Sequence, residues 1–74
     1  MIIEVKSIKE GVFKITVPDE GTILDLKTEI SKEKNQLISH VNIIYNGTML
    51  NDDTQTLAAA GLKNGAAIVL LIRP

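Results

Sequence analysis

The sequence predicts an α+β domain in which one main helix crosses a mixed sheet of four to five strands. Three observations predict this fold class. Apolar and polar residues alternate in several short segments, as they do in strands with one buried face. Between these segments lies one stretch whose apolar residues recur at helical spacing. Glycine, asparagine and proline separate the segments, which is typical of tight turns between short elements.

The first two strands are predicted at residues 1–6 and 12–17, with a turn over residues 7–11 between them. Gly11 can adopt the positive φ that a bulged hairpin turn requires. Pro18 ends the second strand because it fixes φ and lacks a backbone N–H donor. The residues expected on the core face of this hairpin are Met1, Ile3, Val5, Phe13, Ile15 and Val17.

The main helix is predicted between Thr22 and Asn35. Thr22 followed three residues later by Asp25 resembles a capping box, with Asp in place of the usual Glu. Asn35 can end the helix in the left-handed conformation. The helix face expected in the core carries Ile23, Leu26 and Ile30. After the helix, we expect Leu37 and Ile38 to pack as a turn beneath the sheet.

A second hairpin follows the helix. Its first strand is predicted at residues 41–45, with Val41, Ile43 and Tyr45 on the core face. Asn46-Gly47 is a strong tight-turn signal. Residues 48–50 should therefore return as a short strand with Leu50 directed inward.

The last part of the chain is predicted to contain a single helical turn and a final strand. Thr56 can cap the turn and Gly61 can end it. Asn64-Gly65 then leads into the strand at residues 66–73, whose core face carries Ile68, Leu70 and Ile72. A right-handed crossover through the main helix places this strand parallel to the first strand, in the middle of the sheet. This arrangement is a β-grasp.

Length and composition predict one small domain and exclude several function classes. A chain of 74 residues has a small core, and the absence of cysteine excludes disulfides and thiolate chemistry. Such a composition is compatible with the cytoplasm or nucleus. The formal charge of −1 is spread along the chain, which does not favour nucleic-acid binding. The N-terminus is unlike a signal peptide, and no stretch approaches the roughly 20 apolar residues of a membrane span.

Alternation also places large apolar side chains on the sheet face away from the core. Ile44 is flanked by asparagines on that face, and Val69 and Leu71 alternate with core residues in the last strand. Ile8 lies near the tip of the first hairpin turn, where it has little core to enter. Because a domain this small has little else to cover that face, we expect these side chains to be exposed. A cluster of exposed hydrophobic residues marks a binding site.

The order and spacing of a set of residues along the whole chain provide a further indication of the fold and function. These residues are Met1-Ile2-Ile3, Val5-Lys6, Thr22-Ile23, Lys27, Ile30, Ile43-Ile44-Tyr45-Asn46-Gly47, Leu50, Asp52, Thr56-Leu57, Gly61-Leu62 and the closing strand to Arg73. Together they resemble ubiquitin and its relatives, with one inserted residue near residues 54–56. The resemblance implies a ubiquitin-like β-grasp and a hydrophobic recognition patch at Ile8, Ile44, Val69 and Leu71. Because ubiquitin carries a histidine at the position of Val69, the patch should here be more apolar and less sensitive to pH.

Two departures from ubiquitin bear on the class of the domain. Conjugated modifiers end in two glycines, whereas this sequence ends in Arg73-Pro74, and the proline ring and fixed φ do not suit that chemistry. Thr48 and Asn64 stand where ubiquitin has its commonest chain-linking lysines, although Lys6 and Lys27 match other acceptor positions. The resemblance therefore implies a non-conjugated ubiquitin-like domain.

We expect this single domain to occupy residues 1–74 and to be excised from, or N-terminal in, a longer protein. Residues 61–74 are similar to the corresponding part of proteasome shuttle receptors. Residues 30–34 and 38–39 resemble the ubiquitin-like domain of the factor that hands tail-anchored proteins to a targeting complex. The resemblance to that factor implies a contact that needs basic residues around the patch, where this chain carries the uncharged Asn42, Asn46 and Thr48.

These observations predict a non-catalytic protein-interaction module. The expected partners are a ubiquitin-interacting-motif helix, a proteasome subunit or a cochaperone, with no nucleic acid, membrane, cofactor or metal, and the domain is expected to be monomeric in isolation. The expected partner-binding residues are Ile8, Ile44, Val69, Leu71, Lys6, Gly47, Asn42 and Arg73. The alternative is a covalent modifier, or a sulfur carrier of similar fold, whose Gly-Gly tail lies beyond Pro74.

The sequence does not favour an enzyme. His40 is the only histidine, and with its neighbour Ser39 on a turn it does not form a nucleophile and base held by a third group. We interpret it as a solvent-facing turn residue. Asp52 and Asp53 lack a third ligand, so we interpret them as loop residues that favour solubility. The glycines are too dispersed to cradle a phosphate.

Overall fold

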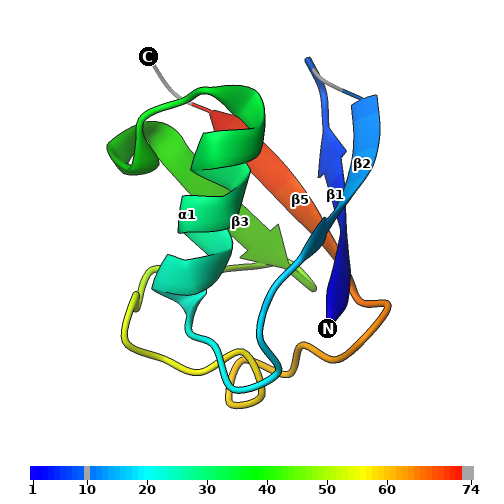
Figure 1. The fold of residues 1–74 in the computed structure, drawn as a ribbon, viewed down its shortest axis with the longest axis vertical. Helices are drawn as coiled ribbons and strands as arrows, with labels where there is room; N and C mark the ends of the chain where they lie inside the picture. The colour runs from blue at the N-terminus through cyan, green and yellow to red at the C-terminus, as the bar shows by residue number, and fades with distance from the viewer. Residues whose placement is uncertain (10, 73–74) are drawn as a thin grey trace.

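Five strands, one α-helix and a 3₁₀ turn make up the computed structural model, which describes residues 1–9 and 11–72 (Figure 1). The elements are β1 (Ile2–Ser7), β2 (Gly11–Thr16), α1 (Ile23–Lys34), η1 (Ile38–His40), β3 (Val41–Tyr45), β4 (Thr48–Met49) and β5 (Ala67–Ile72). The strand order in the sheet is β2-β1-β5-β3-β4. β5 runs parallel to β1 and antiparallel to β3. The central position of the last strand confirms the predicted β-grasp.

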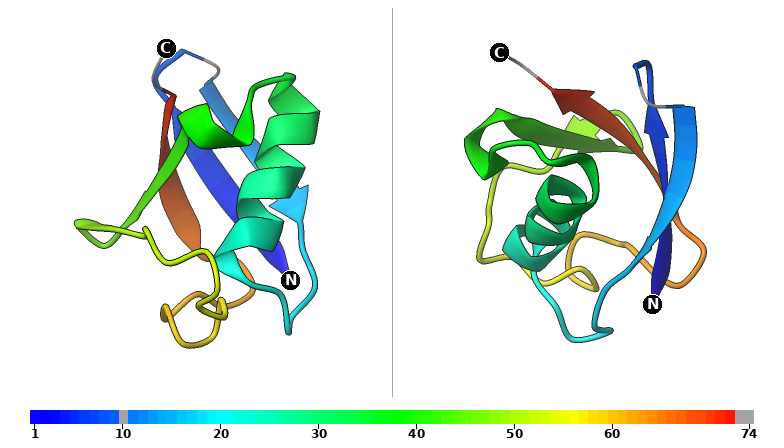
Figure 2. Two further views of the ribbon diagram at one scale, coloured as in Figure 1. Left: turned by 90° about the vertical axis from the view of Figure 1, so that its left-hand side faces the viewer. Right: turned by 45° about the horizontal axis from the view of Figure 1, so that its top comes forward.

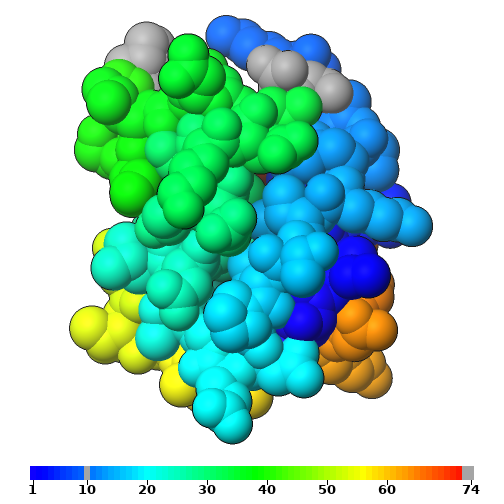
Figure 3. All heavy atoms as spheres, viewed as in Figure 1, coloured from blue at the N-terminus to red at the C-terminus, as the bar shows by residue number. Residues whose placement is uncertain are grey.

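The helix α1 lies across one face of the sheet and contacts β2 and β3 (Figure 2, left). In the space-filling view, α1 and β2 form much of the surface on this side of the molecule (Figure 3). In the described part of the chain, the opposite face of the sheet carries no helix. The outward side chains of the strands on that face are therefore not covered by a described helix.

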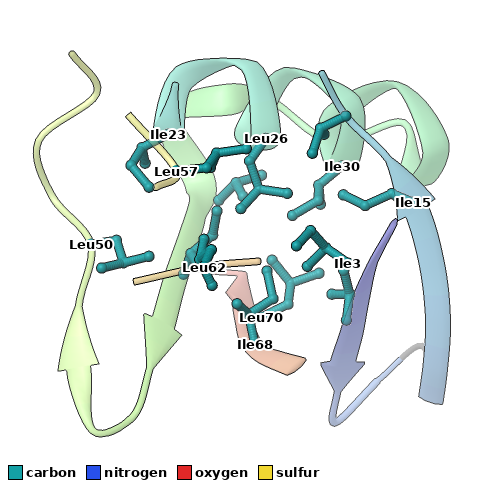
Figure 4. Packing of buried hydrophobic residues seen from close by; sticks show 14 residues of the cluster. Ile3, Ile15, Ile23, Leu26, Ile30, Leu50, Leu57, Leu62, Ile68 and Leu70 are labelled. Carbon is teal, nitrogen blue, oxygen red and sulfur yellow. The ribbon is translucent and has the colours of Figure 1, made fainter. Parts of the chain in front are cut away.

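The hydrophobic core lies between α1 and the sheet (Figure 4). The alternation in the strands and the helical spacing predicted most of its members. The buried residues are Ile3, Val5, Ile15, Val17, Ile23, Leu26, Ile30, Val41, Ile43, Leu50, Leu57, Leu62, Ile68 and Leu70. Four further predicted core residues, Met1, Phe13, Tyr45 and Ile72, are partly buried and pack against the margin of this cluster. No polar or charged side chain is buried among residues 1–9 and 11–72.

Local hydrogen bonds define the two ends of α1. The Asp25 N–H donates to Thr22 Oγ1, and the Thr22 N–H donates to Asp25 Oδ2 at 2.9 Å, so the predicted capping box is present. At the other end, Asn35 adopts the left-handed conformation with φ of 53°, and its N–H donates to the Ser31 carbonyl. The short polar side chain of asparagine tolerates this conformation well.

Both hairpins turn at residues with positive φ. Gly11 has a φ of 75°, as its place at the end of the predicted turn over residues 7–11 required. Asn46 and Gly47 have φ values of 54° and 79°, the pattern of a turn whose twist matches that of the flanking strands. This turn sets the pairing of β3 with β4 and directs Leu50 into the core.

The connection between β4 and β5 is irregular but hydrogen-bonded. Thr56 caps a short turn, because its Oγ1 accepts from the Ala59 N–H at 3.1 Å and its carbonyl accepts from the Ala60 N–H at 3.1 Å. Thr56 also forms a β-bridge with Thr22, which joins this segment to the start of α1. The predicted helical turn is therefore present as a turn rather than as a helix.

The prediction that Leu37 and Ile38 pack beneath the sheet is wrong. Their side chains are 64% and 38% exposed, on a 3₁₀ turn closed by the His40 N–H donating to the Leu37 carbonyl. The interior on either side of this turn is occupied by Ile30 of α1 and Val41 of β3, both buried. Because Ile30 and Val41 already occupy the core next to this short turn, the side chains of Leu37 and Ile38 remain exposed to solvent.

Candidate protein-binding surface

Three predicted site residues form a row across the helix-free face of the sheet. In the strand register, Lys6 of β1 is the partner of Val69 of β5, and Val69 is in turn the partner of Ile44 of β3. Directly opposed residues in neighbouring strands point to the same face and contact one another. Leu71 pairs with Asn42 in the same way, two positions along β5. The topology thus brings residues from three separate segments onto one surface.

We call Ile8, Ile44, Val69 and Leu71 the apolar patch. Ile8 is 90% exposed and Val69 is 43% exposed, so their predicted exposure is confirmed. Ile44 and Leu71 are half-buried. Ile44 is partly covered because it lies between two cross-strand neighbours, Val69 and Met49. The patch is therefore a shallow apolar surface with one strongly projecting residue.

Ile8 projects because it lies on the turn beyond the end of β1, not on the sheet itself. Between this turn and the end of β5 lies a hollow of about 140 Å³. Its lining comprises Ser7, Ile8, Lys9, Leu70, Leu71 and Ile72. Because Leu71 and Ile8 belong to both features, the hollow is continuous with the apolar patch.

Among residues 1–9 and 11–72, the lysines nearest the patch lie on the first hairpin, where Glu4 shares their face as the register partner of Lys14. Lys6, Lys9 and Lys14 of the first hairpin are exposed, and none of them forms an ion pair with another described residue. On the other side, β3 and its turn present Asn42 and Gly47, which are uncharged. The remaining predicted site residue, Arg73, lies outside the described residues. An acidic partner group would therefore find its counterions on the β1–β2 side.

Two apolar residues on this face were missed as candidate site residues. Met49 is the register partner of Ile44, and Val12 is the partner of Lys6, so both extend the row described above. Val12 is 62% exposed and Met49 is half-buried. Alternation could have identified both as outward-facing, because Val12 directly precedes the core residue Phe13 and Met49 directly precedes the core residue Leu50.

The acidic pair in the loop after β4 proves to be structural, and this corrects its interpretation as solubilising loop residues. Asp53 Oδ1 accepts from Lys27 Nζ of α1 at 2.8 Å, and the Lys27 side chain is only 13% exposed. Asp52 Oδ1 accepts from the hydroxyl and the N–H of Thr54, at 2.6 and 3.0 Å. These two hydrogen bonds lower the pKa of the Asp52 carboxyl.

His40, the only histidine in the sequence, lies half-buried on η1, and its neighbour Ser39 is exposed. Over residues 1–9 and 11–72, no three His, Cys, Asp or Glu side chains gather in a way that could hold a metal ion. In the same part of the chain, no helix has the length and apolar character needed to cross a membrane.

Comparison with known proteins agrees with the fold. The model of the family described as "Ubiquitin family" matches residues 3–74. The chain is 30% identical over 73 residues to the UV excision repair protein RAD23 homolog of Dictyostelium discoideum, which covers 99% of this chain and 21% of that protein. It is 28% identical over 67 residues to the UV excision repair protein RAD23 of Saccharomyces cerevisiae, and this match covers 90% of this chain and 17% of that protein.

A third relative is the UV excision repair protein RAD23 homolog B of Bos taurus, 27% identical over 77 residues, covering 100% of this chain and 19% of that protein. The chain thus spans about a fifth of the length of these curated relatives. The family model, in contrast, matches nearly the whole chain from Ile3 onward. The chain therefore belongs to the ubiquitin family.

Proposed function

We propose that this domain is a non-catalytic interaction module whose apolar patch binds partners of the ubiquitin-receptor type. The observation that carries the proposal is the direct cross-strand pairing of Ile44 with Val69 on the sheet face that α1 leaves uncovered. Exposed apolar side chains that cluster on one face, with a polar margin, mark protein interaction sites. We propose further that the domain is monomeric in isolation.

Burial of the patch supports a modest affinity. Fully burying four aliphatic side chains yields about 6 to 12 kcal/mol, whereas association costs roughly 4 to 15 kcal/mol. Ile44 and Leu71 are already half-buried in the free domain. The free energy gained by burying the four side chains therefore lies toward the lower end of the range of about 6 to 12 kcal/mol. Contacts beyond these four side chains are therefore needed to reach a micromolar dissociation constant, which is the affinity we propose for this domain.

We propose the proteasome as the source of the partner, in the cytoplasm or the nucleus. The support is the resemblance of residues 61–74 to proteasome shuttle receptors, together with the similarity to proteins named as RAD23. A cochaperone of the tail-anchored protein pathway is the second candidate. The resemblance to that pathway's factor implies a contact with basic residues around the patch, whereas Asn42, Asn46 and Thr48 leave the β3–β4 margin uncharged.

The substitution Ile44→Ala tests the proposal. It should weaken binding of a ubiquitin-interacting-motif fragment of a proteasome receptor by about tenfold or more, because a central contact residue is removed. Isothermal titration calorimetry would give the affinity, and amide shift mapping would show whether the fragment perturbs Ile44, Val69 and Leu71. The same two measurements with a tail-anchored targeting cochaperone fragment would separate the two candidate partners.

The matched control is Leu24→Ala, since Leu24 is 42% exposed on α1, away from the proposed surface. This variant should bind like the wild type. Circular dichroism should show that both variants are folded. A folded Ile44→Ala domain that binds either fragment with unchanged affinity would refute the patch as the binding surface.

A further inference from the structure

The hollow beside the apolar patch arises from the unequal lengths of two paired strands. The parallel ladder between β1 and β5 ends where Ser7 pairs with Leu70. β5 continues through Leu71 to Ile72, whereas the chain after β1 turns away at Ile8 and Lys9. The two segments therefore diverge, and the space between them is the hollow of about 140 Å³.

The size and lining of the hollow suit one bulky apolar side chain. An engineered cavity of about 150 Å³ lined by Leu, Ile and Phe binds benzene, so this space can accept a group such as isobutyl or phenyl. Ile8, Leu71 and Ile72 supply apolar walls, and Ile72 pairs with Val41 on its other side, which holds that wall in place. At protein interfaces, side chains seated in pockets contribute far more affinity than those on flat surfaces.

A cation stands at the rim of the same hollow. Lys9 contributes to the lining, and Lys6 is exposed on the adjoining strand. Neither lysine forms an ion pair with the other described residues. An ammonium group next to an apolar recess is complementary to a carboxylate that neighbours an apolar side chain.

We propose that the hollow is an anchor site, in which a protein partner inserts one bulky apolar side chain while an adjacent carboxylate pairs with Lys9. This inference rests on the proposed function and specifies the chemistry of the partner. The partner segment carries Leu, Ile, Met or Phe with an Asp or Glu beside it. Its apolar group contacts Ile8, Leu71 and Ile72, and the rest of the segment extends over Val69 and Ile44.

The probe for this site is 4-methylpentanoate, which combines an isobutyl group with a carboxylate. It would be titrated into the 74-residue domain labelled with ¹³C at the methyl groups of Ile, Leu and Val. Saturable shifts should appear at Ile8, Leu71 and Ile72. The neutral analogue 4-methylpentan-1-ol should occupy the same position more weakly, because it lacks the ionic contact with Lys9.

Two variants separate the apolar and the ionic contributions. Ile8→Ala removes an exposed wall of the hollow, so it should weaken the acid and the alcohol alike, by about three- to tenfold. Lys9→Gln should weaken only the acid, by about two- to fivefold, as expected for an exposed ion pair. Lys14→Gln, which removes the same charge from an exposed position outside the lining, should leave both affinities unchanged.

The outcomes also distinguish this inference from the proposed function. Shifts that do not saturate, or that are equally large at the exposed Leu24 and Leu37, would overturn the anchor site. Equal effects of Lys9→Gln and Lys14→Gln would overturn the ionic contact. If Ile44→Ala abolishes capture of the receptor fragment while the hollow stays empty, the proposed function stands and the anchor site falls. If the hollow fills but Ile44→Ala binds the fragment normally, the proposed patch falls.

Discussion

Lys27 shows at the scale of single residues how one side chain joins two distant segments. Its Nζ lies 2.8 Å from Asp53 Oδ1 and the side chain is 13% exposed, whereas the Asp53 side chain is 44% exposed. The aliphatic stem of such a lysine is covered by neighbouring groups while its ammonium keeps a partner. The ion pair ties α1 to the loop after β4, and it is reinforced by the Leu24 N–H donating to the Asp53 carbonyl at 3.2 Å.

Replacing Lys27 by methionine should lower the free energy of unfolding by about 1 to 2 kcal/mol. A hydrogen bond to a charged group contributes about 1.5 to 3 kcal/mol, and the partial exposure of Asp53 reduces this amount. Urea unfolding followed by circular dichroism would measure the change. The control is Lys32→Met, because Lys32 is 72% exposed and lies 3.9 Å from Glu29, and its loss should cost under about 0.5 kcal/mol. Equal losses in the two variants would contradict a structural role for the Lys27–Asp53 pair.

At the scale of elements, the start of α1 is the best-defined boundary in the fold. The capping box satisfies two backbone N–H groups that an isolated helix would leave without partners. The neighbouring Ile23 N–H donates to the Gln55 carbonyl at 2.9 Å, and Thr22 bridges to Thr56. The start of α1 is therefore fixed both by its own capping box and by hydrogen bonds to the loop that contains Gln55 and Thr56.

Thr22→Ala should destabilise the domain by about 0.5 to 2 kcal/mol, because the cap hydroxyl is lost while the backbone contacts remain. Thr22→Ser retains the hydroxyl and should remain within about 0.5 kcal/mol of the wild type. Hydrogen exchange at the amides of the first helical turn would show whether the loss is local. A Thr22→Ser variant as unstable as Thr22→Ala would indicate that the methyl group, not the cap, matters.

At the scale of the whole molecule, stability depends on a small aliphatic core. Among residues 1–9 and 11–72, the 14 buried hydrophobic residues contain no aromatic side chain, so Ile, Leu and Val provide the packing. Leu57 is fully buried although it lies outside every regular element, and its N–H donates to the Gly21 carbonyl at 3.0 Å. It therefore contributes to the core from the connection between β4 and β5.

Leu57→Ala should lower the free energy of unfolding by about 2 to 5 kcal/mol through lost burial and the resulting cavity. That loss is a large fraction of the total stability of about 5 to 15 kcal/mol expected for a domain. Leu37→Ala provides the contrast, since Leu37 is 64% exposed and its truncation should change stability by no more than about 0.5 kcal/mol. Chemical denaturation of both variants would test the assignment of the two leucines. A large effect at Leu37 would mean that this side chain is packed.

Much of the fold could be predicted from local patterns. Alternation assigned Ile43 and Leu70 to the core and Val69 to the outer face, because adjacent strand residues must point to opposite faces. The signal at Asn46-Gly47 predicted the second hairpin because few residues tolerate positive φ there. Such features depend on residues within a few positions of one another, so they can be predicted from the sequence alone.

The candidate surface could be predicted only in part. Alternation selected Ile44 and Leu71, but their half-burial depends on neighbours in other strands, such as Met49 beside Ile44. Leu37 resembles a core residue by type, and its exposure follows from the filled interior around η1. Asp53 could not be paired with Lys27 from the sequence, because 26 positions separate them.

The sequence by itself determined which residues alternate, where the chain turns, where the main helix begins and ends, and which apolar residues face away from the core. Only the tertiary structure decided how far those residues are exposed, which charges pair and where the hollow forms. The reason is that backbone conformation is largely set by short-range sterics and hydrogen bonds. Burial and the divergence of β1 from β5 depend instead on how segments far apart in the chain meet.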